Sequence, residues 1–187
     1  SIDMILCDLP YGTTACKWDT IIPFEPLWKE YKRIIKDNGA IVLTASQPFT
    51  SALVMSNPDM FKYEIIWEKE KPSNFMLLKK QFGKVHENIL VFCKNATIYN
   101  PIKIKANPDK MDKRKRFNDV VKKEGVTSEI KLYRPVDTGM RYPTSILYFN
   151  RDENALHSTQ KPVALFEYLI KTYTNEGDLV LDNCAGS

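Results

Sequence analysis

The sequence predicts an α/β fold in which helices cover both faces of a sheet. Short apolar runs, typical of buried strands, alternate along the chain with segments whose apolar residues recur at helical spacing. The 187 residues suit one domain with a sizeable core. Apolar residues make up 43% and charged residues 27%, which is ordinary for a globular protein and excludes disorder of the whole chain.

The first half of the chain predicts four strands and two helices. The apolar run 4–7 is a buried strand that leads into a loop. An amphipathic helix follows over 24–35, where apolar residues recur every three or four positions and Gly39 provides the C-terminal stop. The further predicted elements are a strand over 40–44, a helix over 46–55, and strands over 61–68 and 87–93.

The second half predicts a helix opened by Pro162 and a last strand over 178–182. Ligands of α/β sheets bind at the carboxyl ends of the strands. Asp8 and Asp182 each occupy that end of a predicted strand, and each is followed by a turn. We therefore expect the functional site at this edge of the sheet.

Between Asn95 and Pro143 the apolar periodicity fades and basic residues accumulate. This segment has a net charge of +6, whereas the whole chain has +4, so the positive excess lies here. One interpretation is a solvated helix face, and the other is a phosphate-binding surface. The candidate phosphate-binding residues are Lys113, Arg114, Lys115, Arg116, Lys131, Arg134 and Arg141.

Two further features narrow the class of protein. The four cysteines form no C-x-x-C pair and the chain has only two histidines, so no metal site is predicted and the thiols are expected to be reduced. No apolar run approaches the roughly 20 residues that cross a bilayer, and no leader peptide is recognisable, so we expect a cytoplasmic protein with no membrane partner.

The residues Asp8, Leu9, Pro10 and Tyr11 have the chemistry to hold an amino group on a flat heterocycle. A carboxylate accepts a hydrogen bond from the amino group. Pro10 removes a backbone donor and stiffens the loop, so that carbonyl groups can face a ligand. Tyr11 offers a ring on which a base can stack. An Asp-Pro turn beside a core tyrosine is the alternative.

Three separated motifs carry a family resemblance. The run D-L-P-Y-G at residues 8–12 resembles the D-P-P-Y motif of amino-methyltransferases, with Leu9 in place of the first proline. H-S-T-Q-K-P at 157–162 and L-V-L-D-N-C-A-G-S at 179–187 resemble the T-Q-K-P helix start and the D-P-F-x-G-S-G cofactor turn, and 86–92 resembles a strand of the family. With the catalytic motif first and the cofactor turn last, the order resembles the β class of DNA N6-adenine or N4-cytosine methyltransferases.

The resemblance implies a Rossmann-like, S-adenosylmethionine-dependent methyltransferase sheet with a circularly permuted motif order. The expected domains are a catalytic half over 1–94, a basic insertion over 95–143 as the candidate target-recognition region, and an incomplete cofactor-binding half over 144–187. Because the chain begins without Met and stops within a glycine-bearing turn, we expect further sequence at both ends.

The implied reaction moves a methyl group from S-adenosylmethionine to N6 of a flipped-out adenine in double-stranded DNA. Asp8 and the carbonyl of Leu9 would accept hydrogen bonds from the amino group, and Tyr11 would stack on the base. The residues implied for the cofactor are Asp8, Thr159, Gln160, Lys161, Asp182, Asn183, Cys184 and Gly186. Asn183 and Cys184 replace a Pro-Phe pair, which removes an aromatic wall beside the cofactor.

Other acceptors and classes stay open at this stage. They are cytosine N4, RNA, and a truncated, inactive relative that only binds DNA through the insertion; the initial Asp8 favours adenine. Without a Pro-Cys pair, methylation of cytosine C5 lacks its nucleophile. Members of the family often form dimers, so a homodimer is an expectation to which no surface is assigned. A paired restriction endonuclease is likewise left open.

Overall fold

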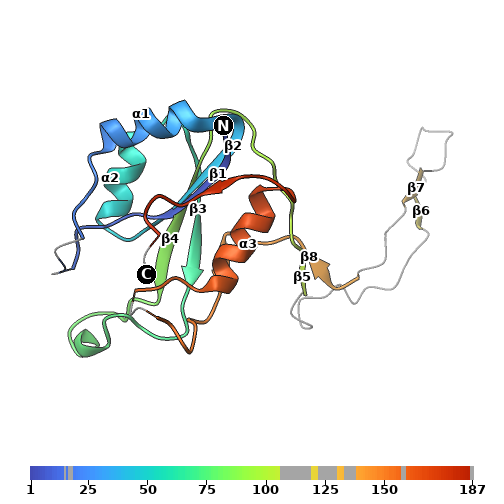
Figure 1. The fold of residues 1–187 in the computed structure, drawn as a ribbon. Helices are drawn as coiled ribbons and strands as arrows, with labels where there is room; N and C mark the ends of the chain where they lie inside the picture. Colours follow the sequence, from blue (N-terminus) through green and yellow to red (C-terminus); the bar gives the residue numbers. More distant parts are fainter. Residues whose placement is uncertain are drawn as a thin grey trace. The chain divides into compact units, whose positions relative to one another are not determined.

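The computed structural model describes residues 1–14, 16, 19–105, 119–121, 130–132, 138–156 and 159–185, with the backbone alone at 119–121 and 130–132. The chain divides into two compact units (Figure 1). Unit 1 comprises Ser1–Pro101 and Thr144–Ser187, and unit 2 comprises Ile102–Pro143. No helix among the described residues is long and apolar enough to cross a membrane.

Unit 1 carries the sheet and the helices. Its elements are β1 (Ile2–Asp8), α1 (Phe24–Ile34), β2 (Ile35–Ala45), α2 (Phe49–Ser56), β3 (Phe61–Glu68), the 3₁₀ helix η1 (Phe75–Leu77), β4 (His86–Phe92), β9 (Ile146–Tyr148), α3 (Val163–Tyr173) and β10 (Val180–Leu181). In unit 2, β5 (Ile104–Lys105) pairs antiparallel with β8 (Met140–Arg141), and β6 (Asp119–Val121) pairs antiparallel with β7 (Ile130–Leu132).

The sheet of unit 1 is mixed, with the strand order β10-β1-β2-β4-β3-β9. Strands β10, β1 and β2 are parallel to one another, and β3 is parallel to β9, whereas β4 runs antiparallel to both of its neighbours. The amino end of β4 therefore lies at the same edge as the carboxyl ends of the other strands.

Alternation along each strand divides the core into two layers. Ile5 and Cys7 of β1 pack with residues of α1 and α2, whereas Met4 and Leu6 pack with residues of α3. This is the period of two expected when both faces of a strand are buried. Figure 1 accordingly shows α1 and α2 on one face of the sheet and α3 on the other.

The predicted elements are present in unit 1, and β3 has the predicted bounds. The prediction of Gly39 as a helix stop is wrong, because α1 ends at Ile34 and its C-cap Ile35 is already extended. Gly39 lies within β2, where a Cβ would lie 2.7 Å from the carbonyl oxygen of Asp3 and equally close to the side chain of Ile35. A close approach of two strands, rather than a helix end, thus requires the glycine.

Unit 2 spans Ile102–Pro143, compared with 95–143 for the predicted insertion. The first residues of that segment belong to unit 1. Asn100, for example, donates its backbone N–H to the carbonyl of Thr172 in α3 at 2.8 Å.

Candidate active site

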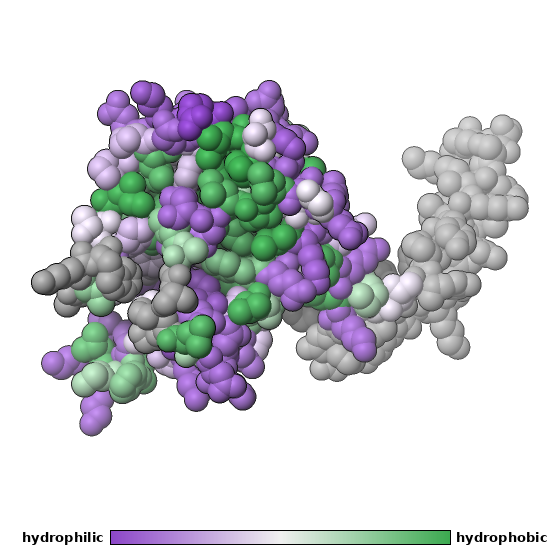
Figure 2. All heavy atoms as spheres, viewed as in Figure 1, coloured by the Kyte–Doolittle hydropathy of each residue, from purple (hydrophilic) through white to green (hydrophobic). Residues whose placement is uncertain are grey.

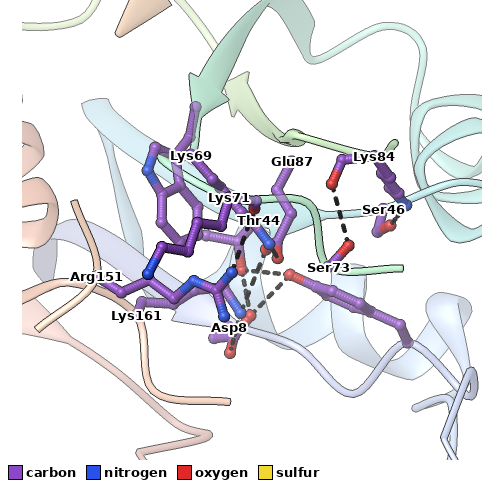
Figure 3. Close-up of polar contacts among 12 residues, drawn as sticks. Asp8, Thr44, Ser46, Lys69, Lys71, Ser73, Lys84, Glu87, Arg151 and Lys161 are labelled. Atoms are coloured by element: carbon purple, nitrogen blue, oxygen red, sulfur yellow. Dashed lines mark hydrogen bonds and ion pairs between the residues drawn. The ribbon is translucent and has the colours of Figure 1, made fainter. Parts of the chain in front are cut away.

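Polar side chains gather where strands of unit 1 end at one edge of the sheet. Asp8 is the last residue of β1 and lies opposite Thr44 of β2 in the register. Glu87 is the second residue of β4 and lies opposite Trp67 of β3. Since β4 runs antiparallel to its neighbours, its amino end brings Glu87 to the edge that carries Asp8 (Figure 3).

Asp8 is held by three neighbouring side chains. Its Oδ1 accepts hydrogen bonds from the hydroxyl of Thr44 and, at 2.8 Å, from the hydroxyl of Tyr11. Its Oδ2 accepts from Nζ of Lys161 at 2.7 Å. The side chain of Asp8 is 30% exposed, whereas that of Lys161 is 9% exposed. The carboxylate is therefore fixed in orientation and still accessible to a ligand, since each carboxylate oxygen can accept more than one hydrogen bond.

A row of alternating charges extends inward from Asp8. Nζ of Lys161 lies 3.5 Å from Oε2 of Glu87, and Oε1 of Glu87 accepts a hydrogen bond from Nζ of Lys69. Nζ of Lys69 lies 4.8 Å from the centroid of the Trp67 ring. Burial lowers the pKa of Lys69, and Glu87 opposes that shift. Each buried charge thus has an opposite neighbour, which offsets part of the cost of removing it from water.

Tyr11 already has an aromatic partner. Its ring stacks on Phe49 with centroids 5.3 Å apart and planes inclined by 27°. Nζ of Lys161 lies 5.4 Å from the centroid of the Tyr11 ring. Burial, together with the negative charges of Asp8 and Glu87, raises the pKa of the phenol, so the hydroxyl stays a hydrogen-bond donor at neutral pH. Stacking of Tyr11 on a base stays a prediction.

The loop after Tyr11 is fastened by a residue that the sequence did not single out. The carboxylate of Asp19 accepts hydrogen bonds from the backbone N–H groups of Gly12 at 2.8 Å, Thr13 at 2.9 Å and Thr14 at 2.7 Å. Burial alone would raise the pKa of Asp19, but these hydrogen bonds and one from the Thr14 side chain outweigh it and lower the pKa. Gly12 has a φ of 66°, which favours glycine. The neighbouring Trp18 lies outside the described residues.

The turn after β10 carries the residues predicted for the cofactor. Oδ1 of Asp182 accepts a hydrogen bond from the backbone N–H of Cys184 at 2.9 Å, which closes the turn. Oδ1 of Asn183 accepts from the hydroxyl of Tyr31 in α1 at 2.6 Å. Cys184 packs against the core layer that contains Cys7. Gly186 lies outside the described residues. Asn183, at a position where the family motif has proline, thus ties the turn to α1.

The three residues before α3 that were predicted to bind the cofactor, Thr159, Gln160 and Lys161, have different surroundings from one another. Gln160 serves its own loop, because its Nε2 donates to Oδ2 of Asp152 at 3.1 Å and its Oε1 accepts from the N–H of Leu156 at 2.9 Å. Lys161 reaches Asp8, a partner that the sequence did not predict. Thr159 is exposed and lines the cavity described next.

A cavity of about 1610 Å³ joins these groups. The predicted site residues that line it are Asp8, Leu9, Pro10, Tyr11, Thr159, Gln160, Lys161, Asp182 and Cys184. Four further basic residues that the sequence did not predict also line it, namely Lys69, Lys71, Lys84 and Arg151. Ser46, the first residue of the predicted helix 46–55, directly follows β2 in the structure. Its hydroxyl accepts a hydrogen bond from Nζ of Lys84 (Figure 3). The described residues contain no group of three His, Cys, Asp or Glu side chains that could hold a metal.

The predicted DNA-binding residues belong to unit 2 and are only partly described. Arg141 is half-buried in β8, and Lys131 lies in β7. Lys113, Arg114, Lys115, Arg116 and Arg134 lie outside the described residues. A role for these residues in DNA binding therefore stays a prediction.

Comparison with known proteins places this geometry in a family. The family model described as DNA methylase matches residues 2–187. The whole chain aligns with the type II methyltransferase M.HpaI of Haemophilus parainfluenzae at 26% identity and with the DNA adenine methyltransferase YhdJ of Escherichia coli K12 at 29%. The chain spans 58% and 66% of the lengths of these two relatives.

Solved structures show the same fold. The complex of M1.HpyAVI with SAM has a TM-score of 0.56 at 22% identity, covering 97% of this chain and 71% of that one. The PvuII DNA methyltransferase, described as cytosine-N4-specific, has a TM-score of 0.58 at 14% identity, covering 97% of this chain and 67% of that one. The predicted α/β methyltransferase sheet is confirmed, whereas the circularly permuted motif order stays a prediction. With its family model matched from residue 2 to residue 187, the chain belongs to the N6_N4_Mtase family of DNA methylases.

Proposed function

We propose that the protein transfers a methyl group from S-adenosylmethionine to the N6 amino group of an adenine in double-stranded DNA. Membership of the DNA methylase family supports methylation of DNA, and the adenine methyltransferase YhdJ among the relatives supports adenine. The observation that carries the proposal is the accessible Asp8 carboxylate, held by Lys161, Thr44 and Tyr11 at the wall of a large cavity.

Asp8 acts on the acceptor. The lone pair of an aromatic amino group is delocalised into its ring, so the nitrogen is a weak nucleophile. By accepting a hydrogen bond from that amino group, the Asp8 carboxylate increases electron density on the nitrogen and orients it. Pro10 has no N–H, so no donor at that position competes for the base. Asp8 is also placed to accept the proton that the nitrogen loses after methylation.

The residues of the cavity fit S-adenosylmethionine. When bound, this cofactor supplies an electrophilic methyl group. Asp182 is an exposed carboxylate that lines the cavity and would hold the cofactor's ammonium group. Thr159 would hold its polar parts. The volume of about 1610 Å³ exceeds the roughly 300–1000 Å³ of a typical small-molecule site, so a cofactor and a base fit together.

Double-stranded DNA is the proposed partner. A base inside a duplex cannot reach the cavity, so the nucleotide must be flipped out. We propose the segment 95–143 as the target-recognition region, with phosphate contacts from Lys113–Arg116 and from Lys131, Arg134 and Arg141. A homodimer is proposed from the family resemblance alone. Because the proposed substrate is DNA, we propose that the protein is cytoplasmic.

A second acceptor has its own support. The PvuII enzyme, whose structure resembles this chain, is described as cytosine-N4-specific. Incubation of the full-length protein with DNA and methyl-labelled S-adenosylmethionine, followed by separation of the nucleosides, distinguishes the two. Label in N6-methyladenine supports the proposal, and label in N4-methylcytosine supports the alternative. Label in RNA only, or DNA binding without transfer, would contradict both.

A further inference from the structure

The loop between β3 and β4, residues 69–85, exposes several large apolar side chains. Phe75 is 69% exposed, Met76 83% and Phe82 98%, and Leu77 and Leu78 are also exposed. Single exposed apolar residues are normal, but a group of them at one place marks an interaction surface. The loop protrudes from unit 1 at the lower left of Figure 1, and Figure 2 shows apolar and hydrophilic residues together there.

Hydrogen bonds hold the shape of this loop. The N–H of Ser73 donates to the carbonyl of Lys84 at 2.9 Å, and the N–H of Lys84 donates to Oδ1 of Asn74 at 2.7 Å. Nδ2 of Asn74 donates to the carbonyl of Phe82 at 3.1 Å. Nζ of Lys84 donates to Ser46, which follows β2. Because these hydrogen bonds join the two arms of the loop to each other and to Ser46, the apolar tip has a defined position.

The loop is basic and adjoins the candidate active site. Its stretch 71–85 contains Lys71, Lys79, Lys80 and Lys84 and no acidic residue. Lys79 and Lys80 are exposed next to the apolar tip. Lys71, Pro72, Ser73, Phe75 and Lys84 line the same cavity as Asp8. Positive charge and apolar side chains therefore lie together beside the cavity that an extruded base would enter.

We propose that this loop docks on double-stranded DNA, with Lys79 and Lys80 against phosphates and with Phe82 and Phe75 against the bases beside the extruded one. The inference rests on the proposed function and adds a docking element outside the predicted insertion. Apolar side chains that insert between base steps are a known means of distorting a duplex. A symmetric contact between two copies would bring the same patch together and oppose lysine to lysine, which disfavours a second copy as the occupant.

Binding to a labelled 30-base-pair duplex of mixed sequence, measured by fluorescence anisotropy over a range of salt concentrations, tests the docking. The Lys79→Gln/Lys80→Gln variant of the full-length protein should reduce the slope of log affinity against log salt by about 1–2, since each phosphate contact contributes about 0.9. Phe82→Ala should weaken binding about tenfold, the scale of a lost base–aromatic contact, with the slope unchanged.

Two matched variants serve as controls. Lys29→Gln/Lys32→Gln removes two exposed charges from α1, and Met55→Ala removes an apolar side chain that is 73% exposed on α2. Both should leave affinity and slope near those of the wild type. Phe82 is almost fully exposed, so its loss should not unfold the protein, and unchanged circular dichroism would verify this.

Other results would overturn the inference. They are affinity within twofold of the wild type for Phe82→Ala, an unchanged salt slope for the double lysine variant, or conversion of a dimer to a monomer by Phe82→Ala with DNA affinity unaltered. The last would assign the loop to a second copy. Methyl transfer is measured separately. A wild-type protein that binds the duplex through this loop but transfers no methyl group to genomic DNA would refute the proposed function and leave the docking intact.

Discussion

Nζ of Lys161 lies 2.7 Å from Oδ2 of Asp8, although 153 positions separate the two residues in the sequence. One residue ends β1 and the other precedes α3. The contact joins the motif at the start of the chain to the motif near its end. The orientation of the proposed catalytic carboxylate therefore depends on both halves of the fold.

Replacement of Asp8 should abolish activity while the fold persists. Asp8→Ala removes the acceptor for the substrate amino group, and we expect methyl transfer to fall by at least 10²-fold, on the scale of a lost transition-state hydrogen bond. Lys161 keeps Glu87 as a charged neighbour, so the far-ultraviolet circular dichroism should be unchanged. Asp8→Asn preserves the shape and one acceptor oxygen and should retain more activity than Asp8→Ala. Near-normal turnover of Asp8→Ala would refute this mechanism.

Two substitutions of Tyr11 separate the roles of its ring and its hydroxyl. Tyr11→Ala should cost about 1–3 kcal/mol of transition-state stabilisation if the ring stacks on the base. Tyr11→Phe keeps the ring and loses only the contacts of the hydroxyl with Asp8 and Thr44, so its effect should be smaller. Initial rates of transfer at saturating cofactor compare the two. Equal losses would assign the effect to the hydroxyl and contradict stacking.

The features that could be predicted from the sequence are those that depend on a local pattern of residues. Apolar periodicity located α1, α2, α3 and the strands β1, β2, β3, β4 and β10 of unit 1, but not η1 or β9. The rule that ligands bind at strand ends located Asp8 and Asp182 at one edge. Periodicity carries no strand direction, so the antiparallel β4, which brings Glu87 to that edge, could not be predicted. The same holds for Lys69, because its pairing with Glu87 arises only once β3 and β4 are adjacent.

Gly39 and Asp19 illustrate a second limit of prediction from sequence. A glycine after a helical pattern is normally a stop, but here the need for a glycine comes from the neighbouring strand β1. Asp19 binds three successive N–H groups that belong to residues five to seven positions earlier. Neither contact leaves a periodic signal in the sequence, so only the folded backbone reveals it.

Glu87→Gln should destabilise the protein strongly. Glu87 neutralises Lys69, which is 7% exposed, and approaches Lys161, which is 9% exposed. Breaking a buried ion pair by removing one partner typically costs about 3–5 kcal/mol, because a buried charge loses its counterion. Urea unfolding measures the free energy of unfolding.

The matched control for this variant is Glu167→Gln. Glu167 forms an exposed pair with Lys171 one turn away on α3. Its loss should cost only about 0.3–0.5 kcal/mol. Equal free energies of unfolding for the two variants would show that the Glu87 network contributes no more than a surface pair.

The contribution of Asp19 to the free energy of unfolding should be lost in acid. Its pKa is lower in the folded protein than the usual value of 3.8, so the unfolded chain binds a proton more readily. The stabilisation is fully present above pH 3.8 and is lost as the pH falls through the lower, folded pKa. Asp19→Asn should reduce stability at pH 7 by about 1–3 kcal/mol and flatten the decline below pH 4. Thermal unfolding from pH 7 to pH 3 checks this, and a decline as steep as in the wild type would contradict it.

The most direct test of adenine methylation through Asp8 is long-read mapping of modified bases in cellular DNA. The host should lack other adenine methyltransferases and should express either the intact gene or its Asp8→Ala variant. The account predicts N6-methyladenine in a defined sequence context with the intact gene and none with the variant. Unmodified adenine with the intact gene, or the same modified positions with the variant, would contradict it.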